Sequence, residues 1–370
     1  MRAEVPVTTV SAAAYTIPTD LPEADGTAQW DSTTLVVVHV EGGGRRGFGY
    51  SYTHACAANL IDTKLAPLLI GQEAMDPPAA WRSMQRAVRN LGRGGIAGTA
   101  ISAVDVALWD LKGQLLERSL ADLLGCYREQ VPIYGSGGFT SYTERELTQQ
   151  LADWVEDTGC RWVKMKIGTQ PGQDPARVAA ARAAIGDSAG LFVDANGAYS
   201  LRQALQLGTR FAAEQQVSWF EEPVSSDDLH GLAQIRARAP EGMDIAAGEY
   251  GYTPQYFQRM LEAAAVDVLQ ADATRCGGVT GFLQAAALCE GHQVQLSAHC
   301  APSLHCTLGC AAPRFRHIEW FHDHVRIEQM LLDGAPTPQR GVLSPDRARP
   351  GLGLTLRASD AARYAVKPQG

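Results

Sequence analysis

The sequence lacks the features that mark nucleic-acid-binding, secreted and membrane proteins. Its 370 residues hold 32 Lys and Arg against 40 Asp and Glu, so it lacks the positive surplus with which proteins bind nucleic-acid phosphates. It also lacks the run of about eighteen apolar residues that a membrane span needs, and its first stretch, MRAEVPVTTVSAAAYTIP, lacks the apolar core of a signal peptide. We therefore expect a cytoplasmic protein with no nucleic-acid or membrane partner.

Cysteine pairs and glycine-rich phosphate turns are missing as well. The eight cysteines form no CxxC pair, which argues against a zinc ribbon, so we expect buried thiols in a chain of this length. No GxGxxG follows an early strand, as a doubly wound dinucleotide-binding sheet would require. With 45% apolar and 19% charged residues the composition is that of an ordinary globular protein, and the length predicts two domains or one barrel with an appendage.

From residue 131 onward, short apolar runs alternate with amphipathic helical segments. This alternation predicts βαβ units and a parallel sheet. A (β/α)₈ barrel fits the number of units best, and a doubly wound open sheet is the alternative. The eight candidate strands are residues 131–137, 162–168, 190–197, 217–223, 244–250, 266–273, 294–299 and 316–321.

The first part of the chain has a different pattern. STTLVVVHVEGG and GGGRRGFGYSY predict antiparallel strands, and helices are expected near 57–70, near 78–92 and over the long segment 100–125. Near the other end, LGLTLR predicts one more short strand. We expect an α+β capping domain over 1–125, a catalytic barrel over 126–335 and a C-terminal segment, 336–370, that packs on the cap.

Ionisable residues stand at the ends of seven successive candidate barrel strands. In a parallel barrel the carboxyl ends of the strands share one mouth, where catalytic groups collect. Several of these residues are spaced 27 or 28 positions apart, about one βα unit, so we expect them to converge. They are Lys164, Lys166, Asp194, Glu221, Glu222, Glu249, Asp272, His299 and Glu319.

The chemistry of these groups points to proton abstraction next to a carboxylate. Asp194, Glu221 and Glu249 offer only oxygen, which suits Mg²⁺ rather than zinc. A desolvated lysine beside another cation can have its pKa lowered enough to act as a base, and Asp272 can orient His299. A metal between two bases suits removal of an α-proton through an enediolate, with Glu319 donating to or sharing a hydrogen bond with the substrate carboxylate.

These motifs resemble those of the enolase superfamily, in particular the mandelate racemase subgroup and its acid-sugar dehydratases. The resemblance runs along nearly the whole chain, although Ser119 stands where the family often has proline. It implies a modified (β/α)₇β barrel under an N-terminal cap, with a C-terminal tail that returns to the cap, in a homo-oligomer of two to eight copies. The matching segments are VKMKIG, VDANGAYS, WFEEP, the GE of Glu249, DATRCGGVTG, SAH, IEW and the helix at 100–125.

The resemblance also implies roles for individual residues. Asp194, Glu221 and Glu249 would bind Mg²⁺, and Lys166 and His299 would be the two acid/base groups. Asp272 would orient His299, and Lys164 would stabilise the substrate carboxylate. Glu222 and Asn196 would support the metal site or bind substrate or water.

Two segments of the cap, about 15–31 and 47–56, are expected from the resemblance to be loops that close over the barrel and select the substrate. They carry Asp20, Trp30, Tyr50 and His54, whose polar groups suit several hydroxyls better than an apolar acid. The substrate is therefore expected to be a polyhydroxylated carboxylic acid.

Three reactions remain open on these residues. The first is dehydration of a sugar acid to a 2-keto-3-deoxy acid, which adds general-acid help to a leaving hydroxyl. The second is racemisation or epimerisation of a 2-hydroxy acid, and the third is cycloisomerisation of a lactone or an anhydro-sugar acid. The same groups serve all three, so the sequence favours the first without excluding the others.

Overall fold

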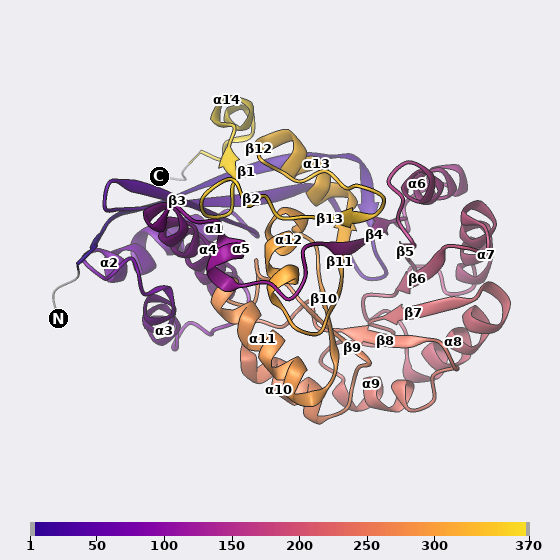
Figure 1. Ribbon diagram of the computed structural model, residues 1–370. Coiled ribbons are helices and arrows are strands. Elements are labelled where there is room, and N and C mark those ends of the chain that lie inside the picture. The colour runs from indigo at the N-terminus through magenta and orange to yellow at the C-terminus, as the bar shows by residue number, and fades with distance from the viewer. Residues whose placement is uncertain (1–3, 368–370) are drawn as a thin grey trace.

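The computed structural model describes residues 4–367, and it places an antiparallel sheet with its helices beside a closed parallel barrel (Figure 1). The predicted fold class is confirmed. The sheet of the cap has the order β1-β2-β3, with β1 (Val7–Ala24), β2 (Gln29–Gly42) and β3 (Arg45–Tyr52).

The prediction that the two cap segments are loops is wrong, because most of each segment is β-strand. Segment 15–31 forms the end of the β1–β2 hairpin that contains its turn, with Tyr15 opposite Leu35 and Glu23 opposite Trp30, and 47–52 lies within β3. The sequence does not predict strand β1, because its Ala-rich centre and its two prolines give a weak strand signal. Pairing along β2 satisfies its backbone groups and overrides that low propensity.

The helices of the cap pack on one side of this sheet. Gly49 of β3 allows the long helix to approach, since a Cβ there would lie 2.3 Å from the carbonyl oxygen of Ala103. The helices are α1 (Cys56–Leu60), η1 (Ile61–Leu65), α2 (Ala66–Leu69), α3 (Pro77–Ala87), α4 (Ile96–Leu116) and α5 (Leu120–Leu124).

The single helix expected over 100–125 is two helices. Helix α4 ends at Glu117, which adopts a left-handed backbone with φ of 52°. Ser119 then begins α5, because its side chain accepts a hydrogen bond from the backbone N–H of Asp122 at 3.1 Å. The break lets the chain turn from the cap into the barrel.

Eight parallel strands close the barrel through pairing of its first and last members, with Ile318 opposite Ile133. Alternate residues face inward and outward, so Val163 and Met165 join the core shared with the surrounding helices. Tyr134, Phe192 and Trp219 fill part of the interior. The strands are β4 (Val131–Gly137), β5 (Trp162–Lys166), β6 (Gly190–Asp194), β7 (Val217–Glu221), β8 (Asp244–Ala247), β9 (Val268–Ala271), β10 (Gln295–Ala298) and β11 (Phe315–Phe321).

Helices follow the strands and cover the outside of the barrel (Figure 1). Their starts carry local signals: Ser200 and Gln203, for example, cap each other's backbone at the start of α8. The helices are α6 (Glu144–Glu156), α7 (Asp174–Ile185), α8 (Leu201–Gln215), α9 (Leu229–Arg236), α10 (Pro254–Glu262), α11 (Gly278–His292), α12 (Pro302–Ala311) and α13 (His322–Leu331).

The C-terminal segment leaves the barrel and returns to the cap. The backbone N–H of Leu352 donates to Asp110 of α4 at 2.6 Å, and that of Val366 donates to the carbonyl of Ala14 in β1 at 2.8 Å. Its elements are β12 (Leu332–Asp333), β13 (Val342–Leu343), β14 (Thr355–Leu356), α14 (Ala358–Ala361) and η2 (Ala362–Tyr364).

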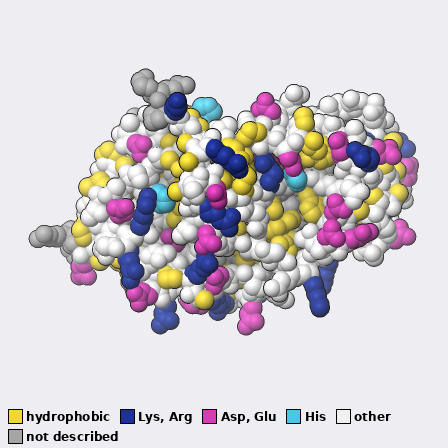
Figure 2. Space-filling view, turned by 90° about the horizontal axis from the view of Figure 1, so that it is seen from above, with side chains coloured by type: hydrophobic (Ala, Val, Ile, Leu, Met, Phe, Trp, Pro, Cys, Tyr) yellow, Lys and Arg dark blue, Asp and Glu magenta, His cyan; other side chains and the backbone are white. Residues whose placement is uncertain are grey.

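The outer surface carries both signs of charge, and on the face drawn in Figure 2 basic and acidic side chains are interspersed. Among the helices of residues 4–367, none combines the length and the apolar character required to cross a membrane.

Candidate active site

Side chains from the ends of neighbouring strands meet at one mouth of the barrel. Lys166, Asp194 and Glu221 are the last residues of β5, β6 and β7, and they stand opposite one another in register. Glu249 follows β8 by two residues. All four are buried, so the barrel holds their charges away from water.

Three of the buried carboxylates form a cluster that suits a hard cation. Asp194, Glu221 and Glu249 each offer an oxygen, and these oxygens lie within 4.8 Å of one another. The Oε2 atom of Glu249 is buried and accepts no hydrogen bond from the described residues. Burial and the neighbouring Asp194 raise the pKa of Glu221 well above its usual range, which a cation would offset. An oxygen-only set of this kind fits Mg²⁺.

The two lysines of β5 bind these carboxylates from the other side. The Nζ atom of Lys164 contacts Glu221 and lies 2.7 Å from Glu319 and 3.3 Å from Asp194. The Nζ atom of Lys166 lies 2.6 Å from Asp194 and donates to the Oδ1 atom of Asn196 at 3.1 Å. Each amine therefore has a fixed direction toward the mouth.

The electrostatics of the lysines differ from the sequence-based expectation. Burial lowers the pKa of both, and the charge of Lys164 lowers that of Lys166 further. The carboxylates outweigh these effects, Glu221 and Glu319 at Lys164 and Asp194 at Lys166, and they raise both pKa values above the usual range. The sequence led us to expect a lowering, and the direction differs here because the closest charges are negative; a cation on these carboxylates would offset their effect on the lysines.

His299 follows β10 and lies across the mouth from β5. Its Nδ1 atom is 2.9 Å from the Oδ2 atom of Asp272, which follows β9. Burial raises the pKa of Asp272, but the hydrogen bond and charge of His299 outweigh it and hold the pKa below its usual range. An ionised Asp272 accepts from Nδ1–H, which leaves Nε2 facing Glu249 at 3.3 Å and Glu319 at 3.8 Å.

Glu319 of β11 is held as a carboxylate by three donors. The Oγ atom of Ser136 donates to it at 2.6 Å, Lys164 lies at 2.7 Å, and the backbone N–H of Cys300 donates at 2.9 Å. Burial raises its pKa, but Lys164 and His299 outweigh burial and hold the pKa well below the usual range. The expectation that Glu319 donates to or shares a hydrogen bond with a substrate carboxylate stays a prediction.

The tip of the β1–β2 hairpin lies directly on the mouth. The backbone of Gly26 is so close that a Cβ would stand 2.3 Å from the carbonyl oxygen of Ala195, next to Asp194. The hydroxyls of Thr140 and Thr169 donate to the carbonyl of Asp25 at 2.9 and 2.7 Å. The tip of the cap therefore covers this part of the mouth.

The predicted substrate residues Asp20, Trp30, Asn196 and Glu222 lie near this closure or the carboxylates. Asp20 is exposed and lies 3.0 Å from the Nε2 atom of His322, at the start of α13. The indole N–H of Trp30 donates to Glu23 at 2.7 Å. Glu222 is buried beside Glu221, and burial and Glu249 raise its pKa well above the usual range.

Tyr50 and His54, the other two predicted substrate residues, do not lie with the four just described. The hydroxyl of Tyr50 is fully buried between β3 and α13 and donates to Glu328 at 2.8 Å. His54 is exposed, and its Nδ1 atom accepts from the backbone N–H of Cys56 at the start of α1. Both side chains thus have structural partners where they stand.

Sequence reasoning missed two residues at the mouth. The guanidinium of Arg275 donates to the carbonyl of Glu249 at 3.1 Å and lies 3.5 Å from its carboxylate. Cys300 places its Sγ atom 3.3 Å from His299 Nε2. The only sequence feature that could have indicated them is their position, since Arg275 lies inside DATRCGGVTG and Cys300 directly follows SAH.

Comparisons with known proteins agree with this geometry. Residues 7–125 match the family model described as mandelate racemase / muconate lactonizing enzyme, N-terminal domain, and residues 146–361 match that described as enolase C-terminal domain-like. The chain is 33% identical over 359 residues, covering 95% of this chain and 96% of the relative, to 3,6-anhydro-alpha-L-galactonate cycloisomerase of Streptomyces coelicolor.

Solved structures share the whole fold. A mandelate racemase/muconate lactonizing enzyme-like protein from Rubrobacter xylanophilus has a TM-score of 0.95 at 51% identity, over 98% of this chain and all of that one. L-Talarate dehydratase from Polaromonas sp. JS666, complexed with Mg and L-glucarate, has a TM-score of 0.88 at 30% identity, over 98% of both chains.

Proposed function

The chain belongs to the mandelate racemase/muconate lactonizing enzyme family of the enolase superfamily, and on that premise we propose that it is a Mg²⁺-dependent sugar acid dehydratase. The reaction would remove the proton on C2 of the acid and the hydroxyl on C3, and the product would be a 2-keto-3-deoxy acid. The observation that carries the proposal is the placement of Lys166 and His299 on two sides of a buried carboxylate cluster.

Lys166 and His299 are the proposed acid/base pair. Their strands, β5 and β10, are separated by β6 to β9, whose ends supply the carboxylates. A substrate carbon between them exposes one face to Nζ and the other to Nε2. One of these atoms takes the C2 proton, and a protonated group at the mouth gives a proton to the departing C3 hydroxyl, which leaves as water.

The metal site is proposed to be Asp194, Glu221 and Glu249. Mg²⁺ bound there would neutralise the negative charge that builds on the carboxylate oxygens of the substrate as its α-proton leaves. Lys164 directs a second positive charge at the same region from β5. Asp272 orients His299, and Asn196 holds the amine of Lys166 in place. Arg275 holds the carboxylate of Glu249 in place.

A polyhydroxylated acid is the proposed substrate class. Support comes from the polar groups that the hairpin brings to the mouth, including Asp20 and the Glu23–Trp30 pair, and from the L-glucarate complex of the talarate dehydratase. The cytoplasmic location and the homo-oligomer of two to eight copies stay predictions.

A cycloisomerase is the second candidate. The Streptomyces coelicolor relative, whose name gives it that activity, matches nearly the whole length of both chains. Such an enzyme abstracts the same α-proton but expels a ring oxygen in place of a free hydroxyl. Racemisation would use the same two bases and no leaving group.

The experiment that separates these reactions is a screen of aldonic, aldaric and anhydro-sugar acids with Mg²⁺. Formation of a 2-keto acid is followed by a colour reaction, and loss of the C2 proton in D₂O by NMR. We expect keto-acid formation from an open-chain acid. Ring opening of an anhydro acid instead favours the cycloisomerase, and exchange with inversion and no keto acid favours the racemase; the absence of all three contradicts the proposal.

A further inference from the structure

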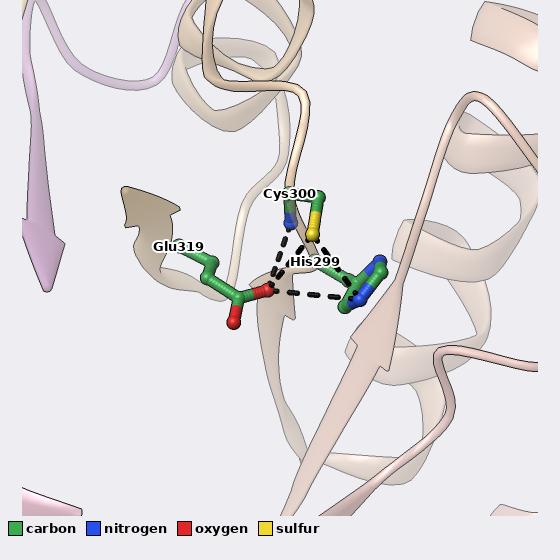
Figure 3. Close-up of side chains that lie close together, drawn as sticks. All are labelled: His299, Cys300 and Glu319. Atoms are coloured by element: carbon green, nitrogen blue, oxygen red, sulfur yellow. Dashed lines mark hydrogen bonds and ion pairs between the residues drawn. The ribbon is translucent and has the colours of Figure 1, made fainter. Parts of the chain in front are cut away.

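A second group of potential metal ligands lies beside the carboxylate cluster, at the ends of β10 and β11. Its members are His299, Cys300 and Glu319, and Figure 3 shows their side chains directed toward one another. The Nε2 atom of His299 lies 3.3 Å from the Sγ atom of Cys300, which lies 3.4 Å from the Oε2 atom of Glu319. The third side, from Nε2 to Oε2, is 3.8 Å.

Two of these separations match one face of a tetrahedral zinc site, and the third, from Nε2 to Oε2 at 3.8 Å, is slightly wider. Zinc binds sulfur at about 2.3 Å and nitrogen or oxygen at about 2.0–2.2 Å, so two tetrahedral ligands stand about 3.3–3.6 Å apart. We propose that His299, Cys300 and Glu319 form an inhibitory binding site for a soft divalent cation such as Zn²⁺, separate from the Mg²⁺ site. The nitrogen and sulfur donors select against Mg²⁺, as the oxygen-only cluster selects for it.

The three donors are already held in place. Asp272 binds Nδ1 of His299, which leaves the lone pair of Nε2 toward the triangle. Ser136 and Lys164 bind Glu319 through its Oε1 atom, so Oε2 faces Cys300. The only direct donor to Oε2 besides the thiol, among the described residues, is the backbone N–H of Cys300.

The backbone at Cys300 adds a further constraint. Its φ is 52°, a left-handed conformation that side-chain-bearing residues seldom adopt and that the surrounding structure must enforce. This conformation aims Sγ back at the histidine that precedes it. Around the triangle, Glu249 places an oxygen 3.3 Å from Nε2 and is the nearest member of the Mg²⁺ cluster.

The consequence for catalysis rests on the proposed function of His299. A cation on Nε2 occupies the lone pair that would accept a proton, and the thiol releases its proton to solvent on binding. Zn²⁺ should therefore inhibit proton transfer while the carboxylate cluster is saturated with Mg²⁺. No redox change is involved.

The test uses Co²⁺ as a coloured substitute for Zn²⁺, added to the Mg²⁺-saturated protein. Wild type should show the near-ultraviolet thiolate-to-cobalt absorption, and Zn²⁺ should displace it. Cys300→Ser and Cys300→Ala should both lose the band, whereas Cys56→Ser, which removes an exposed thiol, should keep it. Zinc X-ray absorption of Cys56→Ser should show one sulfur neighbour at about 2.3 Å.

Inhibition is measured separately, as the Zn²⁺ concentration that halves C2-proton exchange at saturating Mg²⁺. Each rate is normalised to that of the same protein without Zn²⁺, and we expect the halving concentration to be at least about tenfold higher in Cys300→Ser than in wild type. A cobalt band that survives in both Cys300 variants, or zinc bound without sulfur, would overturn the site. A normal band in a protein that acts on no sugar acid would overturn the proposed function and leave the site standing.

Discussion

The Nδ1 atom of His299 lies 2.9 Å from the Oδ2 atom of Asp272, and the pairing of two strands produces this contact. Ala298 of β10 stands opposite Ala271 of β9, so the residues that follow them, His299 and Asp272, lie side by side. A parallel barrel thus converts a sequence spacing of one βα unit into a hydrogen bond. The remaining groups at the mouth follow from the same register.

Replacing the carboxylate of Asp272 should disable His299 as a base and spare Lys166. Asp272→Asn removes the acceptor that holds Nδ1–H, so kcat should fall at least about tenfold, as loss of a partner behind a functional histidine commonly costs. Exchange of the C2 epimer whose proton faces Lys166 should persist. Steady-state kinetics and NMR exchange measure the two effects, with the exposed Asp187→Asn as control. Equal loss for both epimers would contradict a role confined to His299.

The hairpin tip should respond to a single methyl group. In Gly26→Ala the new Cβ would meet the carbonyl oxygens of Ala195 and Ile167 at 2.3 and 2.7 Å, so the tip must lift. Overpacking of this kind costs about 1–3 kcal/mol, so KM should rise about 5- to 140-fold. Gly172→Ala is the matched control, since a Cβ there meets nothing within 4 Å. Unchanged KM and unchanged hydrogen exchange over residues 20–30 would show that the tip does not close the site.

Glu23 makes the stability depend on pH in a defined direction. Burial and Asp323 raise its pKa to about 8, although the bond from Trp30 opposes the rise. The folded chain keeps a proton that the unfolded chain loses above pH ~4.5, so the free energy of unfolding should fall as pH rises from about 4.5 to about 8. Thermal melts at pH 6 and pH 9 measure this. Glu23→Gln should reduce the difference in Tm, and an equal difference in wild type and variant would contradict the assignment.

Magnesium should stabilise the folded chain through the carboxylate cluster. At a hundred times Kd, a ligand bound only to the folded state adds about 2.7 kcal/mol to the free energy of unfolding. The Mg²⁺-dependent rise in Tm should shrink in Glu249→Gln and persist in the exposed Glu241→Gln. Chelation should abolish activity, and added Mg²⁺ should restore it. The same rise in both variants would place the ion elsewhere.

The convergence of groups at the mouth was predictable because seven successive barrel strands carry an ionisable residue at or just after their ends, a local signal repeated in register. Three features depend on tertiary contacts. Strand β1 exists because β2 pairs with its weak sequence, and Tyr50 is buried because α13 supplies Glu328. The pKa values of the lysines rise because carboxylates from other strands lie close to both amines. Their attraction outweighs burial at both lysines and the repulsion of Lys166 by Lys164.

The most direct test of the two-base arrangement is the rate of C2-proton exchange in D₂O, measured by NMR on the acid that the screen identifies and on its C2 epimer. Wild type, Lys166→Ala and His299→Asn are compared at saturating Mg²⁺. Each variant should lose about 100-fold or more of the exchange for the epimer whose proton faces the missing base, and should keep exchange of the other. Exchange at the wild-type rate in both variants would contradict the account.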